Sequence, residues 1–375
     1  MHCFSFPTEI CFGPGVVSQL PRYLKKYNLL RPLLVTDNVV SELPFFKRII
    51  NDLEKSGSSP LIFNEVSKNP VKSDVLKGRD AYQDACDCIV GLGGGAALDV
   101  SRAVALSINN RRDLFDYDDL IGGSNLITEP IPHFITVPTT SGTGSEVGRS
   151  AIISEDKSKK KRILFHSTLI AKQVFADPEL TYDLPPEITA ATGMDALAHH
   201  LEAFLAKGFN PMCDGIALEG VRMTWDNLES AVIRPDNTSR SNMMLASLMG
   251  AVAFQKGLGI VHALSHPLST LFDMHHGLAN AINLPYGLEF NYSSAPDRFD
   301  RLAFVMGLKQ GHGVPESIRD LNHKLGLPAS LGQCGVKTEH IDRLAALALS
   351  DFCLPLNPRS TTLEDLKEIY QRAMG

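Results

Sequence analysis

The first half of the chain alternates short apolar runs with segments of helical periodicity, and this alternation restricts the fold more than any other feature. The apolar runs, which we predict to be strands, cover 32–37, 59–66, 86–95 and 133–140, and the predicted helices between them cover 43–57, 73–85 and 96–109. These strands are apolar along most of their length rather than at every second residue, so both faces of their sheet must be covered. The pattern predicts an α/β domain with a parallel sheet between two layers of helices.

The second half is predicted to be helical. A long helix follows Pro185 and Pro186 and ends near Gly208, with start and stop residues of the usual kinds. Further helical patterns cover 211–233, 238–256, 258–273, 277–283, 313–326, 337–352 and 361–374. We therefore predict a boundary near residue 180, within the linker DPELTYDLPP, between an α/β domain of residues 1–180 and an all-helical domain of residues 181–375.

Composition excludes several functional classes. A net charge of -6 and a pI near 6.1 lack the basic excess of a nucleic-acid binder or a basic membrane-surface protein. No stretch of about 18 continuous apolar residues is present, and the N-terminus shows no signal-peptide pattern. The seven scattered cysteines are expected to be reduced thiols. These features together predict a cytoplasmic protein.

Six of the twelve histidines lie between residues 199 and 276. Asp195 and His199 are four residues apart, as are His262 and His266, so on helices each pair shares one face. One carboxylate and several imidazoles from separate helices would form a ligand set suited to Fe(II) or Zn(II). A single Asp–His pair at this spacing is more often an ordinary surface pair, and spacing alone leaves both interpretations open.

Glycines join a predicted strand to the following helix in GLGGGA (91–96). Such a turn lets a pyrophosphate approach the backbone at a helix N-terminus, where N–H groups and the helix dipole favour an anion, as in Rossmann-like domains. Asp37 ends the first predicted strand, where a carboxylate can bind a ribose hydroxyl and repel a 2′-phosphate. The pattern alone favours a simple tight turn for the glycines, and a turn-capping aspartate explains Asp37 equally well.

Several longer stretches resemble the iron-containing alcohol dehydrogenase family. They are VPTTSGTGSEV (137–147), GMDALAHHLEAF (193–204), GLGIVHALSHPLSTLFDMHHGLANAINLP (257–285) and NPRSTTLEDL (357–366), with shorter similarities in CFGPG (11–15) and GGGAALDVSRAVA (93–105). The resemblance spans essentially the whole chain. It implies a dinucleotide-binding α/β domain followed by an all-helical metal domain, an architecture shared with dehydroquinate synthase-like enzymes.

The resemblance also implies a ligand set. The family's metal ligands fall on Asp195, His199, His262 and His276, and its active-site histidine that is not a ligand falls on His266. His200 and His275 have no counterpart with a role, so we expect both to be structural or to support the ligands.

The residues that the resemblance assigns to the cofactor lie in four places along the α/β half. A fifth place is Leu180, and the full set is Asp37, Gly93, Gly94, Gly95, Ala96, Asp99, Thr139, Thr140, Ser141, Thr143, Ser145, Lys161 and Leu180. Ala96 replaces a serine of the family, which removes a hydroxyl contact but leaves the backbone cradle. Arg102 stands where the family often has lysine, and Arg162 is the alternative to Lys161. Asp37 favours NAD, with NADP as the alternative.

The function that the resemblance implies is reversible hydride transfer between a small alcohol and NAD(P). The metal, Fe(II) or Zn(II), would act as a Lewis acid on the alcohol oxygen. The nicotinamide would lie in the cleft between the domains, and His266 would help to pass the proton to solvent. Phe254 is expected to line the substrate pocket, or to be an ordinary core residue. Arg149 is a candidate for binding an acidic end of the substrate, with a salt bridge or a cofactor contact as the alternative.

Other functions fit the same motifs. A dehydroquinate synthase-like or glycerol-1-phosphate dehydrogenase-like enzyme would need several basic residues near the metal, and Arg149 and Arg102 are the obvious candidates. A non-catalytic metal-binding protein is a further alternative, against which the ligand set, His266 and the glycine loop argue. Family members are often dimers, so we expect a homodimer with a small alcohol or aldehyde substrate that binds neither nucleic acid nor membranes.

Overall fold

A computed structural model describes residues 5–6, 8–82 and 86–375. The chain divides into two units. The α/β unit consists of Ser5–Thr140 and Gly144–Tyr182, and the helical unit consists of Ser141–Thr143 and Asp183–Gly375. The chain passes from the α/β unit to the helical unit between Tyr182 and Asp183, where helical patterns replace strand patterns in the sequence. The short loop Ser141–Thr143 of the first half also belongs to the helical unit.

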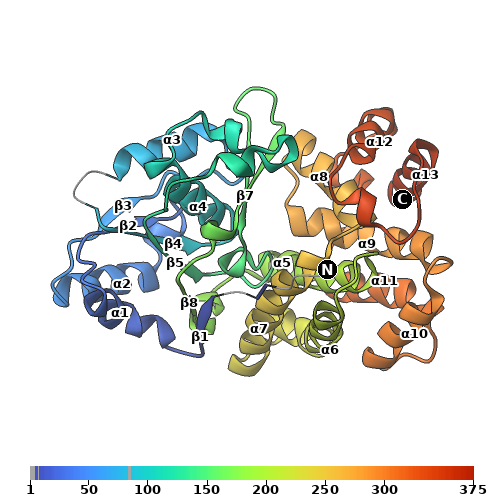
Figure 1. The fold of residues 1–375 in the computed structure, drawn as a ribbon. Coiled ribbons are helices and arrows are strands. Elements are labelled where there is room, and N and C mark those ends of the chain that lie inside the picture. The colour runs from blue at the N-terminus through green and yellow to red at the C-terminus, as the bar shows by residue number, and fades with distance from the viewer. Residues whose placement is uncertain (1–4, 7, 83–85) are drawn as a thin grey trace. The chain divides into compact units, whose positions relative to one another are not determined.

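The α/β unit contains a six-stranded parallel sheet with the strand order β1-β8-β5-β4-β2-β3 (Figure 1). The strands are β1 (Glu9–Phe12), β2 (Pro32–Val35), β3 (Leu61–Phe63), β4 (Cys88–Gly93), β5 (His133–Pro138) and β8 (Gln173–Ala176). Side chains alternate along a strand, so Leu33 and Val35 enter one hydrophobic cluster while Leu34 enters another. Both faces of the sheet are therefore covered, as the apolar runs predict.

Helices of the α/β unit supply these two clusters from opposite faces. They are α1 (Leu20–Lys26), α2 (Pro44–Lys55), α3 (Lys72–Ala81) and α4 (Gly95–Asn109). Leu24 and Phe46 of α1 and α2 pack with Leu34, whereas Val75 and Val104 of α3 and α4 pack with Leu33. The predicted helix 73–85 ends at Ala81, and its last three positions lie outside the described residues. An antiparallel hairpin of β6 (Ser150–Ser154) and β7 (Lys161–Phe165) completes the unit.

The helical unit is built around α5 (Pro186–Leu205), which packs against three neighbouring helices, α6, α7 and α9. The other helices are α6 (Pro211–Ile233), α7 (Asn237–Ala253), α8 (Ile260–Phe272), α9 (His276–Tyr292), α10 (Pro296–Val305), α11 (Val314–Lys324), α12 (Ile341–Leu349) and α13 (Leu363–Ala373) (Figure 1). Every residue of α5 from Thr189 to Leu205 is buried. Asp195 and His199 are therefore in the core, and the interpretation of this pair as a surface pair is wrong.

His200 has a structural role in the packing of α5. A Cβ atom on Gly220 would lie 1.9 Å from Cε1 of His200, so the imidazole fills the space that this glycine leaves on α6. Nε2 of His200 lies 2.9 Å from the carbonyl oxygen of Ala246. Burial lowers the pKa of His200 to about 3, so the ring is neutral at neutral pH.

Two helices differ from expectation. The sequence patterns do not indicate α10, and α9 continues nine residues past the expected end at 283. That end precedes Pro285, which lacks the N–H group that would bond the carbonyl oxygen of Ala281. Nδ2 of Asn322 donates to this oxygen at 2.7 Å. A side chain from α11 thus replaces the missing donor, and the helix extends to Tyr292.

None of the single helices in the described ranges is long and apolar enough to cross a membrane. The segments Asn237–Lys256 and Ile260–Phe272 are long and apolar enough only when taken together, and the chain bends by 108° between them.

Candidate metal centre and dinucleotide site

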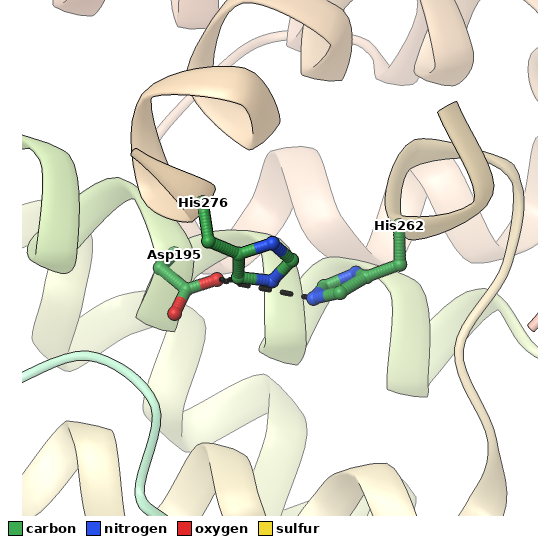
Figure 2. Close-up of side chains that lie close together, drawn as sticks. All are labelled: Asp195, His262 and His276. Carbon is green, nitrogen blue, oxygen red and sulfur yellow. Dashed lines mark ion pairs between the residues drawn. The ribbon is translucent and has the colours of Figure 1, made fainter. Parts of the chain in front are cut away.

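The four predicted metal ligands come from three helices of the helical unit. Asp195 and His199 lie one turn apart on α5, His262 lies in the first turn of α8, and His276 begins α9. Oδ1 of Asp195 is 3.8 Å from Nε2 of His199, 3.8 Å from Nε2 of His262 and 3.5 Å from Nε2 of His276. Figure 2 shows Asp195, His262 and His276 pointing toward one another. One carboxylate oxygen is therefore faced by three imidazole nitrogens.

These spacings suit a single divalent ion. Tetrahedral bonds of about 2.0–2.2 Å to nitrogen and oxygen place the donor atoms about 3.3–3.6 Å apart. Donor atoms of Asp195, His262 and His276 all lie within 4.8 Å of one another. His199 is outside this group of three, although its ring stacks on that of His262 with the centroids 4.8 Å apart. The three residues need only small movements to hold one ion, and ligation by His199 stays a prediction.

Three side chains of this cluster are deeply buried, and burial decides the protonation of His199. The side chains of Asp195 and His262 are each 2% exposed, and that of His199 is 6% exposed. Burial lowers the pKa of His199 to about 4, so its ring is neutral at neutral pH and offers a lone pair. Among the described residues, no lysine or arginine forms an ion pair with Asp195. The buried carboxylate thus lacks a compensating cation of its own.

Glu202 orients His262, and the sequence analysis did not single it out. Its Oε2 lies 2.5 Å from Nδ1 of His262. The same carboxylate accepts the backbone N–H groups of Val261 (2.8 Å) and His262 (3.1 Å) at the start of α8. Burial lowers the pKa of His262, but the hydrogen bond to Glu202 and the negative charges of Glu202, Asp195 and Asp351 together raise that pKa overall. A carboxylate that holds the proton on Nδ1 leaves Nε2 with its lone pair toward the candidate centre.

Asn280, one turn after His276 on α9, is a second residue that the sequence analysis missed. Its Nδ2 donates to Oδ1 of Asp195 at 2.7 Å and lies 3.3 Å from Nε2 of His262 and 3.2 Å from Nε2 of His276. The side chain is fully buried. Its amide therefore contacts the same three donor atoms that would surround an ion.

His266 lies beside the candidate centre without joining it. Its ring stacks on His276 and on Phe352, with centroid distances of 5.3 and 5.2 Å. Nδ1 lies 2.7 Å from Oδ2 of Asp351. Burial raises the pKa of Asp351, but the pairing with His266 and the hydrogen bonds from Cys353 together lower it overall. Because the carboxylate accepts, Nδ1 carries the proton in this pair.

Phe254 lies close to the candidate centre. Its ring centroid is 5.0 Å from that of His199, and it packs against the large hydrophobic cluster of the helical unit. Both expectations for this residue, a pocket wall and a core residue, agree with such a position.

The glycine loop has the form that an anion requires. Gly94 precedes α4, and within the described residues no side chain caps the first N–H groups of this helix. Gly93 has φ +151°, and a Cβ on Gly94 would lie 3.3 Å from Cγ2 of Thr140. Gly95 and Ala96 form the first turn of α4. An open helix N-terminus with a narrow glycine approach fits a phosphate group.

Asp37 and Thr139 lie next to this loop. A Cβ on Gly93 would lie 3.9 Å from Oδ2 of Asp37, and the N–H of Thr139 donates to the carbonyl oxygen of Gly93. Oδ1 of Asp37 accepts the N–H groups of Val39 and Val40 at 2.9 and 2.8 Å. Asp37 therefore caps the turn after β2 with one oxygen, while the other lies toward the glycines.

Asp99, a predicted cofactor residue, belongs to a buried network. Its Oδ1 accepts the hydroxyl of Ser145 at 2.6 Å, and its Oδ2 accepts the N–H of Ile152 at 2.9 Å. Arg102 has no exposed side-chain surface and donates to Asp99, to Ser145 and to the carbonyl oxygens of Leu169 and Ser150. The guanidinium of Arg102 is thus buried and hydrogen-bonded within the core. The prediction that it could bind an anionic substrate is wrong.

The other predicted cofactor residues are divided between the units. Lys161 begins β7, and its charge lowers the pKa of Asp99 against the stronger effect of burial. Arg162, the alternative to Lys161, instead pairs with Glu155 and Asp118. The remaining positions differ in burial and unit: Leu180 is in the α/β core, and Ser141 and Thr143 belong to the helical unit.

Arg149 lies in the α/β unit and is partly exposed. Its Nη2 donates to the carbonyl oxygen of Ser5 at 2.8 Å. This contact matches neither a salt bridge nor a substrate contact, so the proposed role in substrate recognition stays a prediction.

One signal in the sequence could have revealed Glu202 and Asn280. Glu202 is seven residues after Asp195 and three after His199, and Asn280 is four after His276, so each shares a helical face with a ligand. Asp351 offers no such signal, because it comes from a segment 85 residues away from its partner His266.

Comparison with known proteins covers both units. Residues 7–178 match the family described as iron-containing alcohol dehydrogenase, and residues 189–374 match the C-terminal part of the Fe-containing alcohol dehydrogenase family.

Individual relatives match along their whole length. A 4-hydroxybutyrate dehydrogenase of Cupriavidus necator is 41% identical over 98% of both chains. An NAD-dependent methanol dehydrogenase of Bacillus methanolicus is 31% identical over 100% of both. Among solved structures, a 1,3-propanediol oxidoreductase is 31% identical and superimposes with a TM-score of 0.94, again covering 100% of both chains.

Proposed function

This chain belongs to the iron-containing alcohol dehydrogenase family and is an oxidoreductase of the alcohol dehydrogenase class, and we propose that it oxidises a short ω-hydroxy acid to its semialdehyde, reversibly, with NAD. The observation that carries the metal-dependent reaction is the approach of three imidazole Nε2 atoms to one buried oxygen of Asp195. A buried carboxylate faced by three imidazole nitrogens is a ligand set for a divalent ion.

Asp195, His199, His262 and His276 would hold Fe(II) or Zn(II). When bound, the ion supplies Lewis acidity that favours loss of the alcohol proton. Glu202 keeps the Nδ1 proton of His262 in place, so that the Nε2 lone pair faces the site. Asn280 donates to Oδ1 of Asp195 and fixes the orientation of that carboxylate.

His266 is the residue that moves the proton. Asp351 holds a proton on Nδ1, which leaves Nε2 able to accept one from the substrate hydroxyl. Its side chain is 14% exposed, so the proton can be passed on to water.

The α/β unit would hold the dinucleotide, which supplies the hydride acceptor when bound. The open N-terminus of α4 and Gly93–Gly95 would bind its phosphates, and Asp37 would bind the adenosine ribose. A carboxylate at this position repels a 2′-phosphate, so NAD is preferred to NADP. Thr139, Thr140, Thr143, Ser145 and Lys161 are further contacts in this proposal.

The substrate class is supported by one relative. The 4-hydroxybutyrate dehydrogenase, at 41% identity, acts by its name on a short alcohol with a carboxylate at the far end. Arg149 is the residue that we propose for that carboxylate, since a guanidinium pairs with it in two hydrogen bonds. Its present contact is a single hydrogen bond to a backbone oxygen, which a substrate carboxylate can replace.

Chelator-stripped protein tests the metal-dependent reaction. The protein is assayed with NAD and a panel of short alcohols, before and after reloading with Fe(II) or Zn(II), by the absorbance of reduced nicotinamide. We expect no reduction by the stripped protein and restored reduction after reloading. Failure of every alcohol and aldehyde at every metal content contradicts the proposed function.

The substrate class is tested by comparing 4-hydroxybutyrate with 1-butanol in the wild type and in Arg149→Ala. We expect the wild type to prefer the hydroxy acid, and the variant to lose that preference while keeping its rate with 1-butanol. An unchanged preference removes Arg149 from substrate recognition.

A homodimer is also proposed. β1 lies at one end of the sheet, where its outer edge can pair with a second copy. Light scattering on purified protein should give twice the mass of the chain, and a monomer mass contradicts the proposal.

A further inference from the structure

A second group of ligand-type side chains lies next to the candidate centre. His266 of α8 meets Asp351 and Cys353, which follow α12, and one donor atom from each lies within 4.8 Å of the others. We propose that these three residues form a separate inhibitory site for Zn²⁺ or a similar thiolate-binding ion. This site contains sulfur, whereas the candidate centre offers only nitrogen and oxygen.

The three side chains are held in place before any ion arrives. Nδ1 of His266 lies 2.7 Å from Oδ2 of Asp351, and Oδ1 of Asp351 accepts the N–H of Cys353 at 2.9 Å. Asp351 thus fixes the turn that carries Cys353. The side chains of His266 and Asp351 are 14% and 9% exposed, and Cys353 is buried. Water and ions can reach the group from the side of His266.

Small movements are enough to admit an ion. Zn²⁺ bonds of about 2.0–2.1 Å to nitrogen, 2.0–2.2 Å to oxygen and 2.3 Å to sulfur place tetrahedral donors about 3.3–3.7 Å apart. The His266–Asp351 pair would open by less than about 1 Å, and the donors furthest apart would close by about 1 Å. Three protein ligands leave a fourth position for water.

Protons balance in a simple way. The Cys353 thiol loses its proton to solvent and forms a sulfur–zinc bond as thiolate. His266 stays neutral: its proton leaves Nδ1 and a proton from water occupies Nε2, so that Nδ1 gives its lone pair to zinc. No electron is transferred. The Nε2 of His266 then carries a proton and can no longer accept one from the substrate.

Inhibition rests on the role of His266 in the proposed function, whereas the existence of the site does not. An ion held by His266 Nδ1 would fix the tautomer that blocks proton transfer, even with the candidate centre fully loaded. Excess zinc would therefore inhibit an enzyme that a first equivalent of metal activates.

Cobalt tests the site directly, because a Co²⁺–thiolate bond gives a near-ultraviolet charge-transfer band and nitrogen or oxygen ligands do not. Metal-free full-length protein is titrated with Co²⁺. We expect two equivalents to bind, with the band growing as the second is added. Cys353→Ser and Cys353→Ala should bind one equivalent and lose the band.

Cys334→Ser is the matched control, since Cys334 is another thiol of the helical unit that packs on its hydrophobic cluster. It should keep both equivalents and the band. Circular dichroism checks that each variant is folded. The site is overturned if the wild type gives no band, or if the band survives in both folded Cys353 variants.

Zinc then tests inhibition. Protein loaded with one equivalent of metal is titrated with Zn²⁺ during turnover, and removal of one of three ligands should raise the inhibiting concentration at least about tenfold in Cys353→Ser. A charge-transfer band without zinc inhibition supports the site and overturns its inhibitory role. Absence of any alcohol oxidation overturns the proposed function while the cobalt titration still decides the site.

Discussion

Two buried polar clusters of this chain differ in whether they contain a cation of their own. The arginine cluster (Asp99, Arg102 and Ser145) lies in the α/β unit, and the metal cluster (Asp195, His199, His262 and His276) lies in the helical unit. The arginine cluster contains its own cation, whose donors meet carboxylate, hydroxyl and carbonyl oxygens. The metal cluster turns acceptor atoms toward one point and contains no fixed cation.

The two clusters balance their buried negative charge in different ways. Burying a charge is costly unless it is paired. The arginine cluster meets that requirement within the chain, so it joins α4 to β6 and to the loop of Ser145 as a structural unit. The metal cluster meets it only when a divalent ion is added. Charge balance therefore predicts opposite responses to substitution: loss of stability in one cluster and loss of metal in the other.

The largest expected effect is that of Asp195→Asn. This change keeps the shape of the side chain and removes the charge that holds the ion, so metal content should fall below one ion per ten chains. Activity should fall about 10³-fold or more, since a Lewis-acid ion supplies several kcal/mol of transition-state stabilisation. Elemental analysis and kcat/KM measure the two effects.

Asp297→Asn, at an exposed position in the first turn of α10, is the control and should leave metal content unchanged. Full metal occupancy in a folded Asp195→Asn protein would contradict the assignment of this cluster.

Arg102→Met should instead destabilise the α/β unit. It leaves the carboxylate of Asp99 without its paired guanidinium, and removal of one member of a buried ion pair costs about 3–5 kcal/mol. Urea unfolding measures this loss, and metal bound per folded chain should not change. Arg222→Met is the control, because Arg222 is exposed and its pairs with Glu219 and Asp226 contribute about 0–1 kcal/mol.

A double variant sharpens this prediction. Asp99→Leu combined with Arg102→Met removes both charges and should be more stable than Arg102→Met alone. Equal stability of the two proteins would mean that the carbonyl contacts of Arg102, rather than its charge, hold the cluster together.

The two clusters also differ in how far the sequence predicts them. Local sequence pattern indicates the metal cluster, because Asp195 and His199 stand at helical spacing, as do His262 and His266. It also indicates the glycine turn before α4. Family resemblance adds His276. Local pattern cannot show that Arg102 is buried, because its partners at 145, 150 and 169 reach it only through the folding of the β6–β7 hairpin.

The fold follows the same rule. Apolar runs predict the covered parallel sheet, since burial on both faces requires them. The full length of α9 is not predictable from its own residues, because it depends on Asn322 of α11 satisfying the carbonyl oxygen before Pro285. Asp351 likewise reaches His266 from a distant segment. Contacts between distant segments are what the sequence patterns cannot supply.

Glu202→Gln tests the support of the metal cluster. The variant keeps the size of the side chain but loses the charge that holds the Nδ1 proton of His262, so metal affinity should fall about 10–100-fold. Competition with a chromogenic chelator measures the affinity. Glu187→Gln, at an exposed position of the same helix, should bind metal as the wild type does. Unchanged affinity in Glu202→Gln would mean that backbone contacts alone orient His262.

The smallest effect is expected next to the arginine cluster, at Glu146. Burial raises the pKa of this carboxyl from 4.5 to about 7, and its Oε1 has no hydrogen-bond partner among the described residues. Between these two pH values the folded protein keeps a proton that the unfolded chain releases, so the free energy of unfolding falls as the pH rises, by at most about 3 kcal/mol.

Glu146→Gln removes this pH dependence of stability. The variant should match the wild type near pH 5 and exceed its stability by about 1–2 kcal/mol at pH 8, where the buried amide still costs part of the gain. Urea unfolding at both pH values, with exposed Glu179→Gln as control, decides the matter. A variant less stable than the wild type at pH 8 would show that Glu146 is ionised there and paired with Arg102, which would make it a full member of the arginine cluster.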